Sequence, residues 1–344
     1  MKKLIYLAYY LLKTDYATLK SALNCTARKS KKSKFSLLLD MTKSSILYGS
    51  SFVDYFNFQF YTKGKEQRQA YATMGHMYQF HKKMNDANKA HLLDDKNEFA
   101  LHYSQFCNTP IIFKKNKAGQ EEFIKALEKQ EGEKIVFKDP GSTAGRGVYI
   151  DTLYKKEGKL VINDQNIKGF ISTFFKQSEL LYFEKYLEQN KAIQAISPTA
   201  LNTIRVITLV KDDHSVDIIG AIFRISVNSK LDNFSKGNIA AEVDIKSGEV
   251  ITGGIIKNSS CGEYYDRHPI TEEQIKGFKI PMWDTVVKTV KEAALINPEI
   301  RTVGWDVAIL EDDVKLIEGN SKWNKDTWQI PAGYGKKKII QKYL

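Results

Sequence analysis

Cysteine and proline are both scarce in this chain of 344 residues, which contains three cysteines and seven prolines. Cys25, Cys107 and Cys261 lie far apart and form no CxxC pair, so neither a disulfide framework nor a zinc site is expected. A reducing cytoplasm is the natural location for such a chain. The sequence has no proline-rich or serine/glycine-rich linker and no repeat, so we expect one compact unit with two or three subdomains.

A long apolar run is also missing. Residues 2–13 (KKLIYLAYYLLK) have an apolar core of only nine residues, which Lys13 and Asp15 follow at once. This core is too short to cross a bilayer, and the small-residue cleavage site of a signal peptide is not found after it. We therefore expect an amphipathic helix rather than a leader or a membrane span.

Acidic residues are fewer than basic ones: the chain has 52 lysines and arginines and 40 aspartates and glutamates, which gives a formal net charge of +12. Such an excess suits nucleic acid, an anionic membrane, polyphosphate nucleotides or an acidic polymer. Part of the excess lies in residues 28–34 (RKSKKSK) and 336–338, although such runs are commonly no more than solvated surface. With the N-terminal helix, the first run is compatible with a peripheral contact at the inner face of the cytoplasmic membrane.

Residues 304–319 (GWDVAILEDDVKLIEG) consist of two short apolar runs joined by an acidic turn, a pattern that predicts a β-hairpin. With the turn centred on Asp312, Asp306 lies directly opposite Glu318, and strand alternation puts Asn320 on the same face. Three oxygen ligands at one hairpin end suit a hard cation such as Mg²⁺, whose remaining positions go to phosphates and water. From spacing alone, a solvated hairpin end with scattered acids remains the alternative.

A strand predicted at residues 134–138 leads directly into the loop 139–147 (DPGSTAGRG). Its three glycines, two hydroxyl side chains and one arginine suit a loop that presents backbone N–H groups to phosphates. The loop is not a Walker A motif, because no GK[ST] follows, and an ordinary flexible hairpin loop stays open as an alternative.

Hydrophobic periodicity predicts further elements. Residues 35–92 are rich in aromatic residues at helical spacing, which favours packed helices, and His268 beside Pro269 is expected to anchor a loop rather than act as an acid or base. The predicted helices cover residues 93–106, 121–129 and 281–296, and the predicted strands cover residues 111–114, 178–187, 203–210, 216–227 and 239–245.

The order of these motifs resembles the ATP-grasp ligases: a strand lysine before a glycine-rich loop, a later FEKYL segment (183–187) and a terminal Asp…Glu-x-Asn. The segments LNTIRV (201–206), HP (268–269), IPMW (280–283) and the hairpin resemble more specifically the sugar-transfer-associated ATP-grasp proteins. That family accompanies glycosyltransferases in bacterial surface-polysaccharide gene sets, and the resemblance covers about residues 50–335.

The resemblance implies a mixed α+β (α/β) ATP-grasp fold in which two α+β subdomains grip ATP, after a helix-rich N-terminal region. Residues 1–92 would form that region and contribute to an acceptor site or a membrane contact. Residues 93–185 would form the small subdomain with Lys138 and the glycine-rich lid loop. Residues 186–344 would form the C-terminal subdomain with the metal and substrate sites.

The resemblance also assigns roles to single residues. Asp306, Glu318 and Asn320 correspond to the metal ligands, and Arg205 and Arg224 correspond to catalytic arginines that face the γ-phosphate and an acyl phosphate. The residues implied in substrate binding are Asn202, Asn233, Lys236 and Gly237.

For ATP, the resemblance implies two phosphate-binding lysines, a lid over the triphosphate, and a hinge segment that reads adenine. Glu188 is the candidate for the ribose hydroxyls, although its spacing differs from the family pattern. The full set implied in ATP binding is Lys96, Lys138, Gly141, Ser142, Thr143, Ala144, Gly145, Arg146, Gly147, Glu184, Lys185, Leu187 and Glu188.

Cations, glycine N–H groups and metal ligands, without a nucleophile–base pair, are the equipment of phosphoryl transfer. The resemblance implies ATP and Mg²⁺ as cofactors, with two ions and with Mn²⁺ as an alternative metal. It implies a carboxylate–amine ligase that forms an amide through an acyl phosphate. The partners would be a small-molecule or lipid-linked acidic sugar, a hexuronic acid, and an amine or amino acid, in capsule or exopolysaccharide biosynthesis.

Two other functions stay open. One is an ATP-grasp kinase that phosphorylates a sugar or a lipid-linked sugar. The other is a non-enzymatic basic protein that binds nucleic acid or anionic lipid, whereas the ligase interpretation includes no nucleic-acid partner. A homodimer is compatible with the sequence.

Overall fold

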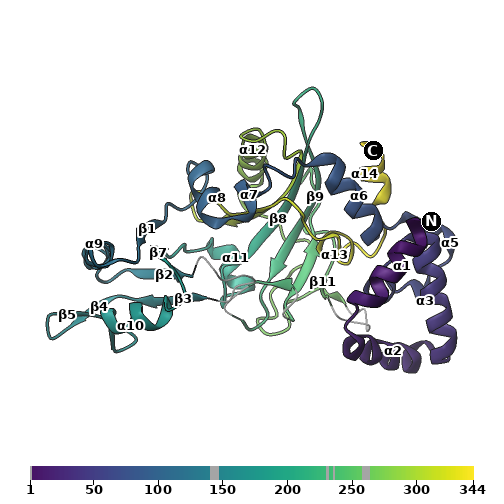
Figure 1. The fold of residues 1–344 in the computed structure, drawn as a ribbon, viewed down its shortest axis with the longest axis horizontal. Helices are drawn as coiled ribbons and strands as arrows, with labels where there is room; N and C mark the ends of the chain where they lie inside the picture. The colour runs from purple at the N-terminus through teal and green to yellow at the C-terminus, as the bar shows by residue number, and fades with distance from the viewer. Residues whose placement is uncertain (1, 140–146, 230–231, 235–236, 258–263) are drawn as a thin grey trace.

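A seven-stranded antiparallel sheet forms the centre of the molecule (Figure 1), in the order β12-β11-β10-β9-β8-β13-β14. The computed structural model describes residues 2–139, 147–229, 232–234, 237–257 and 264–344. The strands of this sheet are β8 (Thr203–Val210), β9 (Val216–Ile225), β10 (Ile239–Glu242), β11 (Gly254–Ile256), β12 (Tyr264–Tyr265), β13 (Thr302–Ile309) and β14 (Val314–Asn320).

Both faces of the large sheet are buried, because apolar side chains occupy both sets of alternating positions. On β8, Ile204 and Val206 belong to a core that includes the apolar side of helix α12 (Trp283–Ala294). Ile207 and Leu209 belong to a second core on the opposite face. Each side chain fully buried in this way contributes about 1.5–3 kcal/mol to folding.

The second core is covered mainly by the N-terminal helices, whose aromatic side chains pack against the sheet. Local capping defines where several of them begin: the side chains of Asp15, Ser33 and Ser51 accept hydrogen bonds from the backbone of the first turn that follows. The helix predicted at residues 2–13 is confirmed. These helices are α1 (Lys2–Lys13), α2 (Tyr16–Ser30), α3 (Lys34–Tyr48), α4 (Phe52–Asn57), the 3₁₀ helix η1 (Phe60–Thr62), α5 (Lys65–Ala70) and α6 (Met74–Met84).

A second sheet, of order β1-β7-β2-β3, forms a smaller unit with its own core at the end of the molecule opposite to α2 and α3 (Figure 1). It carries the short sheet β4-β5-β6 beside it. Its elements are β1 (Ile111–Lys114), α9 (Lys117–Glu128), β2 (Lys134–Lys138), β3 (Val148–Thr152), β4 (Tyr154–Lys156), β5 (Lys159–Ile162), β6 (Gln165–Asn166), α10 (Ile167–Phe174) and β7 (Leu180–Lys185).

The predicted start of the small subdomain at residue 93 is wrong. Leu93, Phe99 and Cys107 are buried in the core of the large sheet, so the small unit begins at β1. The helix predicted at residues 93–106 is two short helices, α7 (His91–Asp94) and α8 (Lys96–His102). Asp95 accepts backbone hydrogen bonds from Asn97 and Glu98 as the N-cap of α8, and this interrupts the helix.

The remaining helices are short and lie on the large subdomain. They are α11 (Lys191–Ile196), α13 (Lys325–Gln329) and α14 (Lys337–Gln341). The predicted strand 239–245 ends at Glu242, whose N–H is bonded to the Thr252 hydroxyl. Within the described ranges, no helix combines the length and the apolar character that a membrane span requires.

Candidate functional site

Three charged side chains form a row across adjacent strands of the large sheet. Arg205 on β8 is the register partner of Asp306 on β13, and Asp306 is the register partner of Glu318 on β14. The sequence predicted the second pairing from a turn centred on Asp312. Near the turn, Val307 pairs with Leu316 rather than with Ile317. The ladder then skips Ile317, so that Asp306 pairs with Glu318 as predicted.

Asp306 is the centre of this row and is 2% exposed. Arg205 Nε and a terminal nitrogen donate to its two carboxylate oxygens at 2.5 and 2.9 Å, and Arg224 donates to Oδ2 at 2.5 Å. Burial alone would raise the pKa of Asp306, but the two guanidinium groups outweigh it and hold this pKa well below its usual range. Asp306 is therefore a permanent anion in the site.

Glu318 lies at the outer edge of the row, and its side chain is 50% exposed. Its Oε1 accepts a hydrogen bond from the amide of Asn320 at 3.2 Å and lies 3.8 Å from Arg205. Desolvation by the surrounding site and the nearby Asp306 carboxylate raise the pKa of Glu318 to about 7. The predicted pairing of Asp306 with Glu318 is confirmed, and the amide of Asn320 lies beside them at the same hairpin end, whereas the role of the three as metal ligands stays a prediction.

These donors fit a divalent cation that completes its shell elsewhere. No group of three or more His, Cys, Asp or Glu side chains with metal-binding geometry occurs among the residues that the structure describes. Mg²⁺ needs only one or two carboxylates when phosphates and water fill the other positions. Desolvation is the first cause of the raised pKa of Glu318 and the like charge of Asp306 is the second, and a bound cation would offset both.

Asp232 also belongs to the site, and the sequence analysis missed it. It is buried, accepts from Arg224 at 2.6 Å through Oδ1, and accepts from the N–H and hydroxyl of Thr203 through Oδ2. Arg224 is thereby held between two carboxylates, and its Nε has no hydrogen-bond partner within the described residues. The available signal was an aspartate directly before the predicted substrate residue Asn233.

On the smaller sheet, Lys138 at the end of β2 forms an ion pair with Glu184 of β7, to which Tyr182 also donates at 3.2 Å. Burial and the Lys138 ammonium group lower the pKa of Lys96, whereas the Glu318 carboxylate acts in the opposite direction. Lys96 therefore lies within electrostatic range of both Lys138 and the predicted metal ligand Glu318. The phosphate-binding roles of Lys96 and Lys138 stay predictions.

The Glu184 carboxylate is engaged by Lys138 rather than open to a nucleotide, so its adenine-reading role stays a prediction. In the hinge that follows, Lys185 pairs loosely with Glu133 at 3.7 Å and is exposed. Leu187 is partly buried and Glu188 is exposed. The ribose-binding role of Glu188 stays a prediction.

Strands β2 and β3, which flank the glycine-rich loop in the sequence, pair antiparallel. Gly147 has a φ of 71°, which an L side chain rarely adopts, and its carbonyl accepts from Asp139 N–H at 2.7 Å. The other predicted lid residues, Gly141, Ser142, Thr143, Ala144, Gly145 and Arg146, lie outside the described residues, as does Lys236.

Asn202 does not have the predicted position of a substrate contact. It is 1% exposed, its NH₂ group donates to Gln189, to the Ser197 carbonyl and to a third carbonyl, and its oxygen accepts from Ser226 N–H. The amide is saturated by the protein and connects the segments before β8 and after β9. The prediction failed because a polar residue before a strand can serve buried backbone groups as well as a ligand.

His268 anchors a loop, as predicted. It is 1% exposed, one ring nitrogen lies 2.9 Å from the Ser226 carbonyl, and the other accepts from the backbone of Ile270 and Thr271. Of the other substrate predictions, Gly237 lies in a turn with a φ of 85°, and the Asn233 carbonyl accepts from Asn238.

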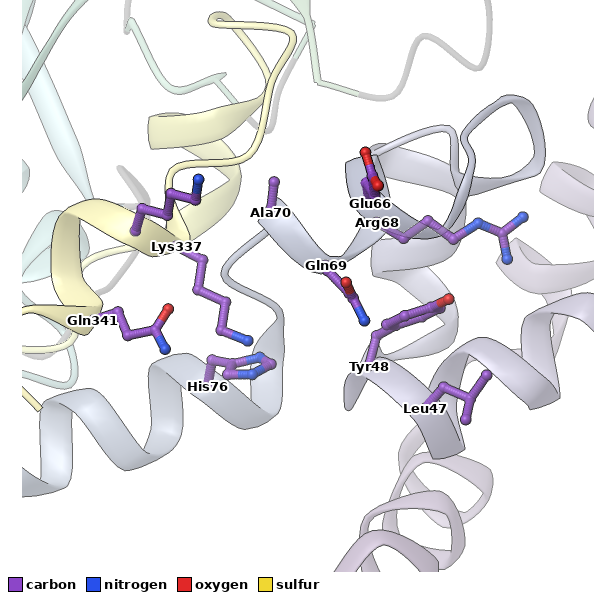
Figure 2. Close-up of a pocket in the computed structure, with 10 residues that line it drawn as sticks. Leu47, Tyr48, Glu66, Arg68, Gln69, Ala70, His76, Lys337 and Gln341 are labelled. Atoms are coloured by element: carbon purple, nitrogen blue, oxygen red, sulfur yellow. The ribbon is translucent and has the colours of Figure 1, made fainter.

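A separate cavity of about 540 Å³ lies between α3, α5, α6 and α14, where Lys337, His76 and Tyr48 face it (Figure 2). It shares no lining residue with the carboxylate row. Arg68 at its edge is already bound to Asp40 through both carboxylate oxygens, at 2.7 and 2.8 Å. The cavity is therefore not an extension of the candidate site.

Comparisons with known proteins concern most of the chain. The family model described as "Sugar-transfer associated ATP-grasp" matches residues 76–343. A search of curated proteins found no match. The family model covers α6 to α14 and leaves α1 to α5 outside the match.

Solved structures similar to this chain include a D-alanine–D-alanine ligase from Bacillus anthracis, with 15% identity and a TM-score of 0.40 over 73% of this chain and 66% of that one. A D-alanyl-alanine synthetase A from Vibrio cholerae shows 11% identity and a TM-score of 0.42, over 73% and 63%. An N5-carboxyaminoimidazole ribonucleotide synthetase in an ADP complex shows 10% identity and a TM-score of 0.38, over 68% and 46%. The chain spans less than two thirds of the length of each of these proteins.

Proposed function

The chain belongs to the sugar-transfer associated ATP-grasp family, and we propose that it is an ATP- and Mg²⁺-dependent carboxylate–amine ligase. The proposed carboxylate is that of a hexuronic acid, as a nucleotide sugar, a lipid-linked unit or a polymer. The proposed amine is an amino acid or another small amine. The proposed setting is bacterial capsule or exopolysaccharide biosynthesis, at the cytoplasmic side of the membrane.

The row Arg205–Asp306–Glu318 is the observation that carries this proposal. It combines a permanent anion, a second carboxylate and an arginine on three adjacent strands, and Arg224 and Asn320 lie beside it. No group in this row is a nucleophile. Such a site favours transfer of a phosphoryl group between bound substrates, because it positions the substrates and neutralises their negative charge.

Asp306, Glu318 and Asn320 would hold Mg²⁺, which supplies charge neutralisation to the ATP phosphates when bound. Lys138 would bind the triphosphate from the smaller sheet, and Lys96 would bind it from the start of α8 on the large subdomain. Arg224 is suited to an anionic oxygen, because its buried Nε is a donor with no partner among the described residues. Asp232 would hold Arg224 in the orientation that this contact needs.

In the proposed reaction, a carboxylate oxygen of the sugar acid bonds to the γ-phosphorus of ATP, and the bond to ADP breaks. The amine nitrogen then bonds to the acyl carbon, phosphate leaves, and the nitrogen loses a proton. Arg205 and Arg224 would bind the anionic acyl phosphate between these steps. By holding it inside the site, they would prevent its hydrolysis.

The test is ADP release from Mg²⁺-ATP over a panel of uronic acids and their nucleotide sugars, each with and without an amino-acid mixture. Glu318→Ala is the blank, and Glu299→Ala, which changes an exposed glutamate elsewhere, is the matched control. ADP that appears only with acid and amine together supports the ligase and identifies both substrate classes. A stable phosphorylated sugar without amine would instead identify a kinase.

A further inference from the structure

Helix α3 is apolar on two sides, and the protein covers only one of them. Leu37 and Met41 are buried in the core of the N-terminal region. On the other side, Phe35 is 71% exposed, Leu39 is 57% exposed and Leu38 is 38% exposed. Ile46, which is partly buried, continues this side toward the end of the helix.

The exposed side chains form one stripe on the helix. Phe35, Leu39 and Ile46 fall within about 40° of one another on a helical projection, and Phe35 to Ile46 spans about 16 Å along the axis. Lys34 and Lys43 lie about 100° and about 80° to either side of Phe35 on the same projection, so the apolar stripe has a lysine along each border. Both lysines are exposed. We call this surface the outer face of α3.

Positive charge is concentrated in the segment of the sequence that carries the outer face of α3. Residues 1–48 contain ten lysines and arginines and only two acids, Asp15 and Asp40, so they carry +8 of the net charge of +12. Five of these basic residues lie in the run 28–34, at the end of α2 and the start of α3. Asp40 is also neutralised, because Arg68 binds both of its oxygens.

We propose that the outer face of α3 is a docking surface for an anionic phospholipid membrane. A helix that lies in the plane of the interface inserts its apolar side, and basic residues along the borders pair with anionic headgroups. A membrane is favoured over a folded protein partner because residues 1–48, which carry the stripe, have ten basic side chains and only two acidic ones.

This surface is independent of the proposed ligase site. It lies outside the residues that the family model matches, and α2 and α3 form the end of the molecule opposite to β1–β5 (Figure 1). A protein bound through this end keeps the smaller sheet, with Lys138, directed away from the membrane. Failure of the ligase proposal would therefore leave the membrane proposal untouched.

The test is co-sedimentation of the full-length protein with vesicles of phosphatidylcholine alone or mixed with phosphatidylglycerol. We expect binding to the mixed vesicles only, with an affinity that falls as salt is raised. The double variant Phe35→Ser/Leu39→Ser should bind at least tenfold more weakly, whereas Leu101→Ser, which changes a leucine that is also 71% exposed on α8, should bind as the parent does. Lys34→Glu/Lys43→Glu should lose binding in the same way, and Lys288→Glu, on α12, should not.

Equal binding to neutral and anionic vesicles, or no binding to either, would overturn the proposal. A second contrary result is a monomer–dimer equilibrium that the Phe35→Ser/Leu39→Ser variant abolishes although its vesicle binding is unchanged. The outer face of α3 would then be an interface between copies of the chain. Retention of vesicle binding by both double variants would also overturn it. Unchanged thermal unfolding of the two variants shows that each measurement concerns a folded protein.

Discussion

Asp306 and Glu318 face each other across the β13–β14 hairpin because Ile317 is left out of the ladder between them. Nearer the turn, Val314 and Leu316 are buried in the apolar core. Uninterrupted alternation would turn Glu318 toward that same core, since it lies two residues beyond Leu316. The irregularity at Ile317 reverses the side on which Glu318 emerges and places it beside Asp306.

Binding of Mg²⁺ in the presence of ATP should weaken as the pH falls below about 7. Only the ionised Glu318 carboxylate binds a cation, and its pKa is raised to about 7, so protonation competes with the metal at lower pH and not at higher pH. The measurement is a Mg²⁺ titration at about pH 6 and about pH 8, with up to about tenfold lower affinity at the lower value. Glu318→Gln should lose most of the affinity and this pH dependence, whereas Glu299→Gln should keep both.

Asp232→Ala should lower both stability and activity. The change removes one of the two carboxylates that hold the buried guanidinium of Arg224, and it leaves the Thr203 donors unpaired. Breaking a buried pair of this kind costs about 3 kcal/mol in the free energy of unfolding, measured by urea denaturation. Asp213→Ala is the control, since this exposed aspartate bonds to Ser215 two residues away. An equal effect of the two changes would refute the role given to Asp232.

Lys138→Met should raise the dissociation constant for ATP at least tenfold, which corresponds to about 1.4 kcal/mol. Lys138 is the positive group at the end of β2, and methionine replaces it with an unbranched side chain of similar length that has no charge. Lys134→Met, on the same strand and exposed, should leave ATP binding unchanged. Calorimetric titration with ATP measures the affinity of both variants. Similar affinities of the Lys138→Met and Lys134→Met variants would show that Lys138 does not bind the nucleotide.

Asn202→Ala should destabilise the protein and leave its KM for the acid substrate unchanged. The Asn202 side chain hydrogen-bonds to buried polar groups in the segments before β8 and after β9. Each buried polar group left without a partner lowers the free energy of unfolding by about 1–3 kcal/mol. Urea denaturation measures the loss, with the exposed Asn88→Ala as the control. A raised KM without a loss of stability would restore the substrate role that the sequence suggested.

Local patterns in the sequence were enough to predict β1, β2 and β8 with their observed bounds, and to pair Asp306 with Glu318. Those features depend on alternation and on a short turn. The contacts of Asp232 with Arg224 and Thr203 join three segments through the register of the large sheet, which no local pattern encodes. The same limit explains why Asn202 was given to a substrate, and why residues 93–107 were assigned to the wrong core.

Transfer of oxygen from the carboxylate substrate to phosphate tests the proposed reaction most directly. With the acid identified by ADP release and labelled with ¹⁸O in its carboxylate, the ligase route leaves one labelled oxygen in the inorganic phosphate. This label appears because the carboxylate oxygen that bonds to the γ-phosphorus stays with the phosphate when the amine displaces it. Mass spectrometry of the phosphate should show the label for the parent protein. Unlabelled phosphate, formed together with ADP and amide, would contradict activation of a carboxylate at the Asp306–Glu318 site.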